Sequence, residues 1–519
     1  MKLALTALLG AGLSLSLAQT VPSPAPSGIA GFVNNNTVGS YPCAGGNPNS
    51  LAVPLSNQTD AAVVQVDQQQ QQQQQVMDAQ VANTTYAGYS GPAGQYSYGT
   101  CPDGKAPQYP ANVVRISAED DSIRAGFIPY GATLVELWVR DRNGAWRDVV
   151  LSFDNTTNYL TDPIHPNFGP TVGRYANRIK NGTFTANNET YYVPRNENGK
   201  NSLHGGDVGY DRSPFVVESF NATSIVFAHV DPDGFQGFPG QVDSRVIHAL
   251  QPNATWAISM SANVSAPQDV QTPILLSSHV YWNLDAYADG SNSTILDHVL
   301  HMPHADKYIQ TDSDLIPTGP RPDVSGTPFD FLQPTPFRRN FDNSTGICGA
   351  NCTGWDSCFW QSNEPARDEP QLELYSPRSG IKLSLTTDQP AFQVYTCSGI
   401  SSPTKGSLPR KKSHGGDGTL AEIYENHSCV VIEAEGLIDA INNPDWNVDQ
   451  FYSASRPYTW AAEYRFSNVD EQGQPIAASS AATATASATA TSASVASPSI
   501  ANATSSAINT PARRDTNGM

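Results

Sequence analysis

Positive charge is scarce in this sequence. Its 519 residues include 29 Lys and Arg against 48 Asp and Glu, which gives a formal net charge of −19 at pH 7. A surface of that sign repels phosphate backbones and anionic lipid headgroups. We therefore expect neither nucleic acid nor a membrane as a partner. The charge fits an extracellular protein that works at mildly acidic pH.

Long apolar runs are also rare. Beyond the first 18 residues, no stretch reaches the roughly 18 apolar residues of a membrane span. Residues 1–18 have the pattern of a signal peptide, with Lys2 before an apolar stretch and the small Ala18 before the expected cleavage site. A buried strand is the alternative for this segment. We expect a secreted protein, free or associated with the cell wall.

Cysteine is sparse, with seven in the chain. An oxidising compartment would join most of them in disulfides and leave one thiol over. Cys43 and Cys101 are candidates for one pair, whereas Cys348, Cys352 and Cys358 are too close together to assign; a zinc site there is the alternative. About fourteen Asn-x-Ser/Thr acceptor sites also suit a secreted chain with exposed loops. They include Asn57, Asn155, Asn253 and Asn426.

Composition divides the chain after residue 18 into three parts. Residues 19–105 form an extension with a glutamine run at 68–75, expected to be partly disordered, although a helical spacer is the alternative. Residues 476–519 are nearly all Ala, Ser and Thr, which cannot bury a core, so we expect a disordered tail. Residues 106–475 are left to form the folded domain.

Within that domain no long amphipathic helix stands out, and apolar residues alternate with polar ones. In residues 254–265, Trp256, Ile258 and Met260 alternate with small or polar neighbours, and residues 381–388 alternate in the same way. A period of two is typical of half-buried strands, and turn signals separate the runs. The sequence therefore predicts an all-β fold, a large antiparallel β-sandwich.

A series of short segments follows one another along the domain. The main ones are GPTVGRYANRIKNGTF from Gly169, NSLHGG from Asn201, LLSSHVYWNL from Leu275, GWDSCFW from Gly354, QPAFQVYT from Gln389 and IEAEGLIDAINNPDW from Ile432. No single segment is specific, but in this order they resemble the aldose 1-epimerase (galactose mutarotase) family over about residues 110–470. The resemblance is to secreted, fungal-type members. It implies a β-sandwich of the galactose mutarotase type (supersandwich), a monomer, a small aldohexose as substrate, and neither metal nor organic cofactor.

The resemblance also implies roles for individual residues. His279 matches the general acid and Glu433 the general base. Five residues match sugar-binding positions: Asn177, Arg178, His204, Asp356 and Gln393. To interconvert anomers, a carboxylate takes the proton of the C1 hydroxyl while an imidazolium protonates the ring oxygen. The ring opens, C1 rotates, and reversed transfers close it. We expect Glu433 to start ionised and His279 to start protonated.

Some assignments have rivals. Glu435 lies two residues from Glu433, where the family has glutamine, and Ile438 replaces the family's proline. Arg174 competes with Arg178, although its position suits packing better. Asp356 lacks the histidine and asparagine that usually follow it. These departures leave the preferred sugar open.

Four other histidines invite metal or site interpretations. His298, His301 and His304 are three residues apart, so on a strand they cannot converge on a metal. His414 opens a second HGG within a basic, glycine-rich stretch, which we interpret as an exposed loop outside the site.

Three other functions compete with an epimerase. A carbohydrate-binding protein would not need both His279 and Glu433. A glycoside-cleaving enzyme needs two carboxylates about 5–9.5 Å apart across the bond, for which Asp356 and Glu433 are candidates. A hexose-phosphate epimerase should show clustered basic residues, and the motifs supply only Arg178.

Overall fold

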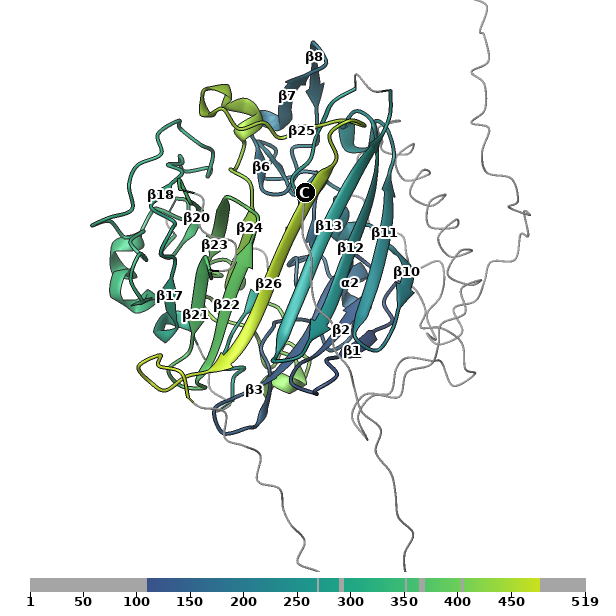
Figure 1. Cartoon of the computed structure of the whole chain (residues 1–519). Coiled ribbons are helices and arrows are strands. Elements are labelled where there is room, and N and C mark those ends of the chain that lie inside the picture. The colour runs from purple at the N-terminus through teal and green to yellow at the C-terminus, as the bar shows by residue number, and fades with distance from the viewer. Residues whose placement is uncertain are drawn as a thin grey trace, which may run out of the picture. The chain divides into compact units, whose positions relative to one another are not determined.

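Antiparallel strands make up nearly all the regular structure in the computed structural model of this chain (Figure 1). The structure describes residues 110–476 except 268–269, 289–293, 351, 364–368 and 403–405, and all of these lie in one compact unit. The expected signal peptide, the extension up to residue 105, nearly all of the tail and the proposed Cys43–Cys101 pair lie outside the described residues.

The largest sheet has nine antiparallel strands. Its members β11, β12, β13 and β26 are the long arrows at the centre and right of Figure 1. In spatial order they are β10 (Val216–Phe220), β11 (Ser224–Asp231), β12 (Gln241–Gln251), β13 (Thr255–Ser265), β26 (Tyr458–Asn468), β22 (Ile381–Thr387), β21 (Leu372–Tyr375), β17 (Val299–His301) and β19 (Thr335–Pro336).

Two smaller antiparallel sheets accompany it. The five-stranded sheet carries most of the residues discussed below, and its order is β16 (Tyr281–Trp282), β24 (Val430–Glu435), β23 (Ala391–Tyr395), β20 (Asp356–Trp360) and β18 (Lys307–Tyr308). The four-stranded sheet is a meander of β1 (Val114–Ser117), β2 (Arg124–Ile128), β3 (Thr133–Arg140) and β4 (Trp146–Asp148).

Four two-stranded ladders and several short helices make up the remaining regular structure of the described residues. The ladders pair β14 (Thr272–Pro273) with β25 (Phe451–Tyr452), β15 (Ser277–Ser278) with β5 (Thr171–Val172), β6 (Arg178–Ile179) with β9 (Ser202–Leu203), and β7 (Thr183–Ala186) with β8 (Glu189–Tyr192). The helices are α2 (Asn158–Thr161) and the 3-10 turns η2 (Lys180–Gly182), η3 (Tyr210–Arg212), η4 (Phe235–Gly237), η5 (Ile295–Asp297), η6 (Phe337–Asn340), η7 (Asp342–Ser344), η8 (Lys412–His414), η9 (Ala440–Asn442) and η10 (Pro444–Trp446). Among the described residues, no helix is long and apolar enough to cross a membrane.

The alternation seen in the sequence explains the long strands. Along β12 and β13 nearly every second residue is buried and the residues between are at least partly exposed. Such a strand buries one face and leaves the other in water. The predicted all-β, antiparallel fold is confirmed, and the alternating runs at 254–265 and 381–388 form β13 and β22.

The inner face of the nine-stranded sheet packs against the five-stranded sheet. Trp256 of β13 stacks on Tyr464 of β26 with ring centroids 4.7 Å apart, and both rings contact Trp282 of β16. The indole of Trp460 on β26 donates a hydrogen bond to the carbonyl of Ala434 on β24. Burying several large aromatic rings in one layer contributes much of the stability of such a core.

Strand β24 is buried along its whole length, but its two faces differ in chemistry. Val430, Ile432 and Ala434 belong to the core cluster under the nine-stranded sheet. Successive side chains on a strand point to opposite faces, so Glu433 and Glu435 point together to the other side. The strand therefore separates an apolar core from a buried polar region.

Two expectations about loops change with the structure. The interpretation of His414 as an exposed residue is wrong: its side chain is fully buried, with ring nitrogens bonded to the Tyr424 hydroxyl and the Asp148 carbonyl. A buried ion pair between Lys411 and Asp148, 2.6 Å apart, holds this basic stretch against the sheet. Of the crowded cysteines, Cys348 and Cys352 form a disulfide, so they are not zinc ligands.

The two other described disulfide cysteines lie beside the five-stranded sheet. A disulfide joins Cys397, two residues after the end of β23, to Cys429, which directly precedes β24. Cys358 is left as a buried free thiol, the only one among the described cysteines.

Candidate active site

A short ladder brings together two motifs that the sequence keeps more than twenty residues apart. Arg178 of β6 pairs with Leu203 of β9, and His204 follows β9 directly. The backbone N–H of His204 donates to the Asn177 carbonyl, while the Asn177 N–H donates to Nδ1 of His204. Asn177, Arg178 and His204 are thus fixed side by side.

The glycines of the NSLHGG segment explain how its histidine turns inward. Gly205 has φ +91°, and a Cβ at this position would lie 2.1 Å from the Gly173 carbonyl oxygen. Only glycine fits so close to another backbone segment. His204 itself is in the left-handed region at φ 52°, and its side chain is 9% exposed. The tight turn therefore places a buried imidazole in the site.

His279 is held between two pairs of strands. It follows β15, which pairs with β5, and precedes β16, which pairs with β24. Its N–H donates to the Pro170 carbonyl, and its carbonyl accepts from the Gly169 N–H. Its ring is perpendicular to that of His204, with centroids 5.1 Å apart. Because both backbone groups are bonded, the backbone from which the imidazole projects is held in place.

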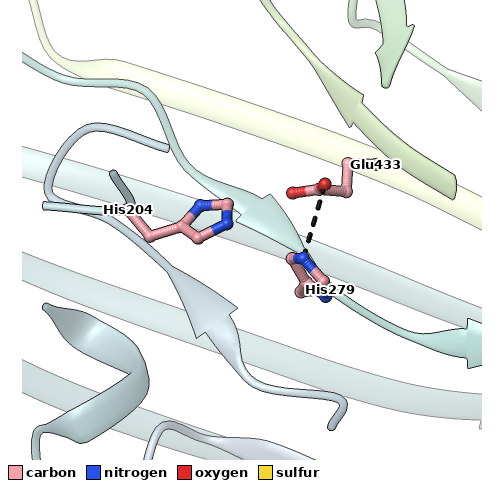
Figure 2. A group of neighbouring side chains, drawn as sticks. All are labelled: His204, His279 and Glu433. Carbon is pink, nitrogen blue, oxygen red and sulfur yellow. Dashed lines mark ion pairs between the residues drawn. The ribbon is translucent and has the colours of Figure 1, made fainter. Parts of the chain in front are cut away.

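The side chains of His279 and Glu433 meet in this buried region. Nε2 of His279 lies 3.6 Å from Oε1 of Glu433, and both side chains are less than a tenth exposed. Figure 2 shows the rings of His204 and His279 and the carboxyl of Glu433 directed toward a common space. The sequence placed these three residues in segments far apart in the chain, and the structure brings them together.

The remaining sugar-binding candidates line up across the five-stranded sheet. Gln393 of β23 lies opposite Glu433 of β24 on one side and Cys358 of β20 on the other. The Gln393 amide donates to Oδ1 of Asp356 at 2.5 Å. Nη2 of Arg178 lies 3.6 Å from Oδ2 of Asp356. All seven predicted residues thus belong to one group, in which Asp356 is the most exposed and marks its outer side.

Glu197 is a member of this group that the sequence did not reveal. Its carboxylate accepts from Nε and Nη2 of Arg178 at 2.8–3.0 Å. A buried guanidinium needs such a partner, because an unpaired buried charge is strongly destabilising. Arg178 is therefore held in a largely buried ion pair, with its own side chain 8% exposed and that of Glu197 17% exposed. The turn before NSLHGG contains nothing that marks Glu197.

Glu435 occupies the same face as Glu433, but its contacts differ. The Asn177 side-chain amide donates to Oε1 of Glu435 at 2.8 Å, while Oδ1 of Asn177 accepts from Arg178 at 3.3 Å. Glu433 faces His279 and Glu435 faces Asn177. The geometry therefore favours Glu433 over Glu435 as the partner of the histidine.

The electrostatics of the pair differ from the expected starting state. Burial lowers the pKa of His279 to about 4. Burial, and then the charges of Glu435 and Asp356, raise the pKa of Glu433 well above its usual value, while Arg178 opposes this rise. Both shifts favour the neutral forms, a protonated Glu433 and a neutral His279, whereas the sequence-based expectation was an ionised Glu433 and a protonated His279. In either arrangement the pair holds one proton, as an acid–base pair needs.

Three buried oxygen atoms of this group lack a hydrogen-bond partner among the described residues. They are Oε2 of Glu433, Oε2 of Glu435 and Oε1 of Gln393. Buried polar atoms are nearly always paired, so a group of exceptions in one place calls for an explanation. A polar ligand with several hydroxyl groups would satisfy them.

The donor set fits such a ligand better than a metal ion. One ring nitrogen or carboxylate oxygen each of His204, His279 and Glu433 lies within 4.8 Å of the others. However, Nδ1 of His204 accepts the Asn177 N–H, so the neutral ring carries its proton on Nε2. Two protein ligands would remain, fewer than the three of a typical catalytic zinc site.

The other candidates lie outside this group. Arg174 is buried and pairs with Asp231 at 2.6 Å, which confirms its packing role. The three spaced histidines have different partners and do not converge: His298 accepts from the Leu284 N–H, and His301 and His304 lie near Glu373 and Glu369.

Comparison with known proteins gives a consistent picture. The family model described as aldose 1-epimerase matches residues 114–465. A probable aldose 1-epimerase from Arthroderma benhamiae is 41% identical over 370 residues, covering 66% of this chain and 82% of that protein. Galactose mutarotase from Sus scrofa is 32% identical over 346 residues, covering 66% of this chain and 90% of that protein. The crystal structure of an aldose epimerase homologue from C. elegans aligns with a TM-score of 0.59 and 27% identity, covering 69% of this chain and 99% of that one.

Proposed function

The chain belongs to the aldose 1-epimerase family and is an isomerase of that kind, and we propose that it interconverts the α and β anomers of an aldohexose outside the cell. The observation that carries the proposal is the buried His279–Glu433 pair, with 3.6 Å between Nε2 and Oε1. The neighbouring Arg178, Gln393 and Asp356 offer the planar hydrogen-bonding groups that sugar hydroxyls require.

The proposed reaction uses the one proton that the pair holds. Transfer of this proton from Glu433 to His279 creates a carboxylate and an imidazolium. The carboxylate then removes the C1 hydroxyl proton while the imidazolium protonates O5, so the C1–O5 bond breaks and a C1 carbonyl forms. After C1 rotates, the reverse transfers close the ring and restore both groups. Each positioned acid–base group of this kind contributes about 10²–10⁴-fold.

The proposal of secretion, as a fungal-type member, draws on the surface and the cysteines. The eight described acceptor asparagines are all exposed, as glycosylation requires: Asn155, Asn181, Asn188, Asn221, Asn253, Asn263, Asn343 and Asn426. The disulfides Cys348–Cys352 and Cys397–Cys429 suit an oxidising compartment. The identity with the Arthroderma benhamiae protein supports the fungal type.

Polarimetry of freshly dissolved α-glucose and α-galactose tests the activity. The protein should accelerate the approach to anomeric equilibrium for at least one sugar, and the His279→Asn/Glu433→Gln double variant serves as the control. A wild-type rate no faster than that of this variant would refute the proposal and favour a binding protein. A glycoside-cleaving enzyme would instead release sugar from an aryl glycoside, and a hexose-phosphate epimerase would act only on the phosphorylated sugar.

Mass spectrometry of protein from the culture medium of a secreting host tests the localisation. Cleavage before Gln19 and glycans on the exposed asparagines are expected. Retention of the unprocessed chain inside the cell would contradict secretion.

A further inference from the structure

Glu435 is a fully buried carboxyl group that the acid–base reaction itself does not use. It lies two residues after Glu433 on β24, and residues two apart on a strand point to the same face. Across the ladder it is opposite Ala391, which offers no polar side chain. Its Oε1 accepts the Asn177 amide, and its Oε2 has no partner among the described residues.

A chain of polar contacts joins this carboxyl group to the sugar-binding side chains. Glu435 orients the Asn177 amide so that its Nδ2 faces the carboxyl and its Oδ1 faces Arg178. Arg178 in turn lies beside Asp356, which accepts from Gln393. Glu435 therefore contacts the sugar-binding side chains through Asn177 and does not contact His279.

The surroundings of Glu435 disfavour a negative charge on it. Titratable groups from five parts of the chain face Glu435. They are Glu433 of the same strand, Arg178 of β6, Asp356 and Cys358 of β20, Tyr175 before β6, and Tyr458 of β26. Arg178 is the one cation among them, and Glu197 and Asp356 already share its charge. Burial raises the pKa of Glu435 to about 8, although Asn177 and Arg178 oppose the rise.

We propose that Glu435 is a positioning residue that must keep its proton for the enzyme to work. As a neutral carboxylic acid it accepts a hydrogen bond from the Asn177 amide and leaves Glu433 free to ionise. Once ionised, it places a second negative charge beside Glu433 and holds the catalytic proton there. The inference rests on the proposed roles of Glu433 and His279.

A glutamine side chain is the natural comparison at this position. It can accept the same hydrogen bond from Asn177 but never gains a charge. Glutamic acid at position 435 therefore adds an upper pH limit of its own, separate from the loss of the Glu433 proton.

The test measures kcat and KM by polarimetry from pH 5 to pH 9, after subtraction of the spontaneous rate. Wild type, Glu435→Gln, Glu435→Leu and the control Glu463→Gln, on the outer face of β26, are compared. In wild type kcat should fall about tenfold per pH unit above about pH 8. In Glu435→Gln this fall should disappear, so that the variant exceeds wild type about tenfold at pH 9.

Glu435→Leu removes the acceptor for Asn177 as well as the charge. Its KM should rise about tenfold at every pH, as expected when a buried hydrogen-bonded support is lost, and the Gln variant should restore the low KM. The control should show the wild-type profile. Infrared difference spectra at pH 6 give an independent readout, because Glu433 and Glu435 should both contribute to the protonated-carboxyl absorption of wild type. The Glu435 component should be missing in Glu435→Gln, while the Glu433 component should remain.

The outcomes separate this inference from the proposed function. If wild type does not accelerate mutarotation at any pH, the proposed function fails. If wild type is active but Glu435→Gln shows the same alkaline fall, or wild type shows none, the role of Glu435 is refuted. Should Glu435→Leu fail to fold, the pH profile of kcat in Glu435→Gln and the protonated-carboxyl absorption still test the role of Glu435.

Discussion

Nε2 of His279 and Oε1 of Glu433 are 3.6 Å apart, which is longer than a direct hydrogen bond and shorter than a full water layer. The two groups therefore face each other without being locked together. A sugar whose C1 hydroxyl and ring oxygen bridge them would bring both proton transfers within hydrogen-bond reach.

Replacing either member of the pair should stop most of the catalysis. Glu433→Gln removes the base and His279→Asn removes the acid, while both keep much of the side-chain size. Each should lower kcat by about 10²-fold or more, and the double variant should lose far less than the product of the two losses because both act in one cycle. Polarimetry near pH 6 measures this effect, and Glu435→Gln should cause a much smaller loss there. A larger loss from Glu435→Gln than from Glu433→Gln would move the base to Glu435.

The lowered pKa of His279 sets an acid limit on activity. Above about pH 4 burial keeps the ring neutral, and the raised pKa of Glu433 favours its protonated form. Below that pH His279 also takes a proton, and the pair loses its base. The polarimetric rate should therefore stay nearly level from about pH 7 to pH 5 and fall about tenfold per unit below pH 4. A midpoint near 6.5, the usual histidine value, would show that His279 is not held neutral by burial.

Glu197 should affect sugar binding through Arg178. The Glu197→Gln variant keeps the shape but loses the ion pair made at 2.8–3.0 Å. Without its partner the Arg178 guanidinium is less firmly positioned, so KM should rise about tenfold with a smaller change in kcat. Arg178→Ala should raise KM at least as much, and adding Glu197→Gln to it should have little further effect. Glu189→Gln, exposed on β8, is the control. Equal KM values in Glu197→Gln and wild type would contradict this role.

Much of the fold could be predicted because its signals are local. The alternation around Trp256 is a property of neighbouring residues, and it marks β13 whatever the rest of the chain does. The order of the motifs identified His204, His279 and Glu433, and the structure brings all three together. Their catalytic roles stay predictions.

The rest depends on contacts that only the folded chain contains. Glu197 reaches Arg178 because β6 and β9 pair, and nothing around it in the sequence indicates that ladder. His414 is buried because Lys411 forms an ion pair with Asp148, more than 260 residues earlier in the chain, and His414 bonds to the Asp148 carbonyl. These contacts hold the polar segment against the sheet. The raised pKa of Glu433 likewise follows from burial and from the charges beside it.

The N-terminal extension and the tail should be dispensable for chemistry. Every predicted site residue lies between Asn177 and Glu433, and the described strands end with β26 at Asn468. A chain of residues 100–475 should therefore turn over sugar within about twofold of the full-length rate, because no group that acts on substrate is lost. Polarimetry on both proteins checks this. A folded but inactive shorter chain, with folding verified by near-ultraviolet circular dichroism, would contradict it.

A buried histidine far from these roles should make the fold sensitive to acid. His248 on β12 is buried against Phe127, with ring centroids 4.4 Å apart, and burial lowers its pKa to about 3. Below about pH 6.5, the usual histidine pKa, His248 takes up a proton in the unfolded chain but stays neutral in the folded one. The free energy of unfolding is therefore highest above that pH, as far as His248 is concerned, and declines as the pH falls. At pH 5 the loss is about 2 kcal/mol. His248→Phe keeps an aromatic ring and cannot titrate, so its Tm should drop less between pH 7 and pH 5 than that of wild type. His304→Gln, a partly exposed control, should keep the wild-type drop, and the same drop in His248→Phe would show that His248 does not cause the acid sensitivity.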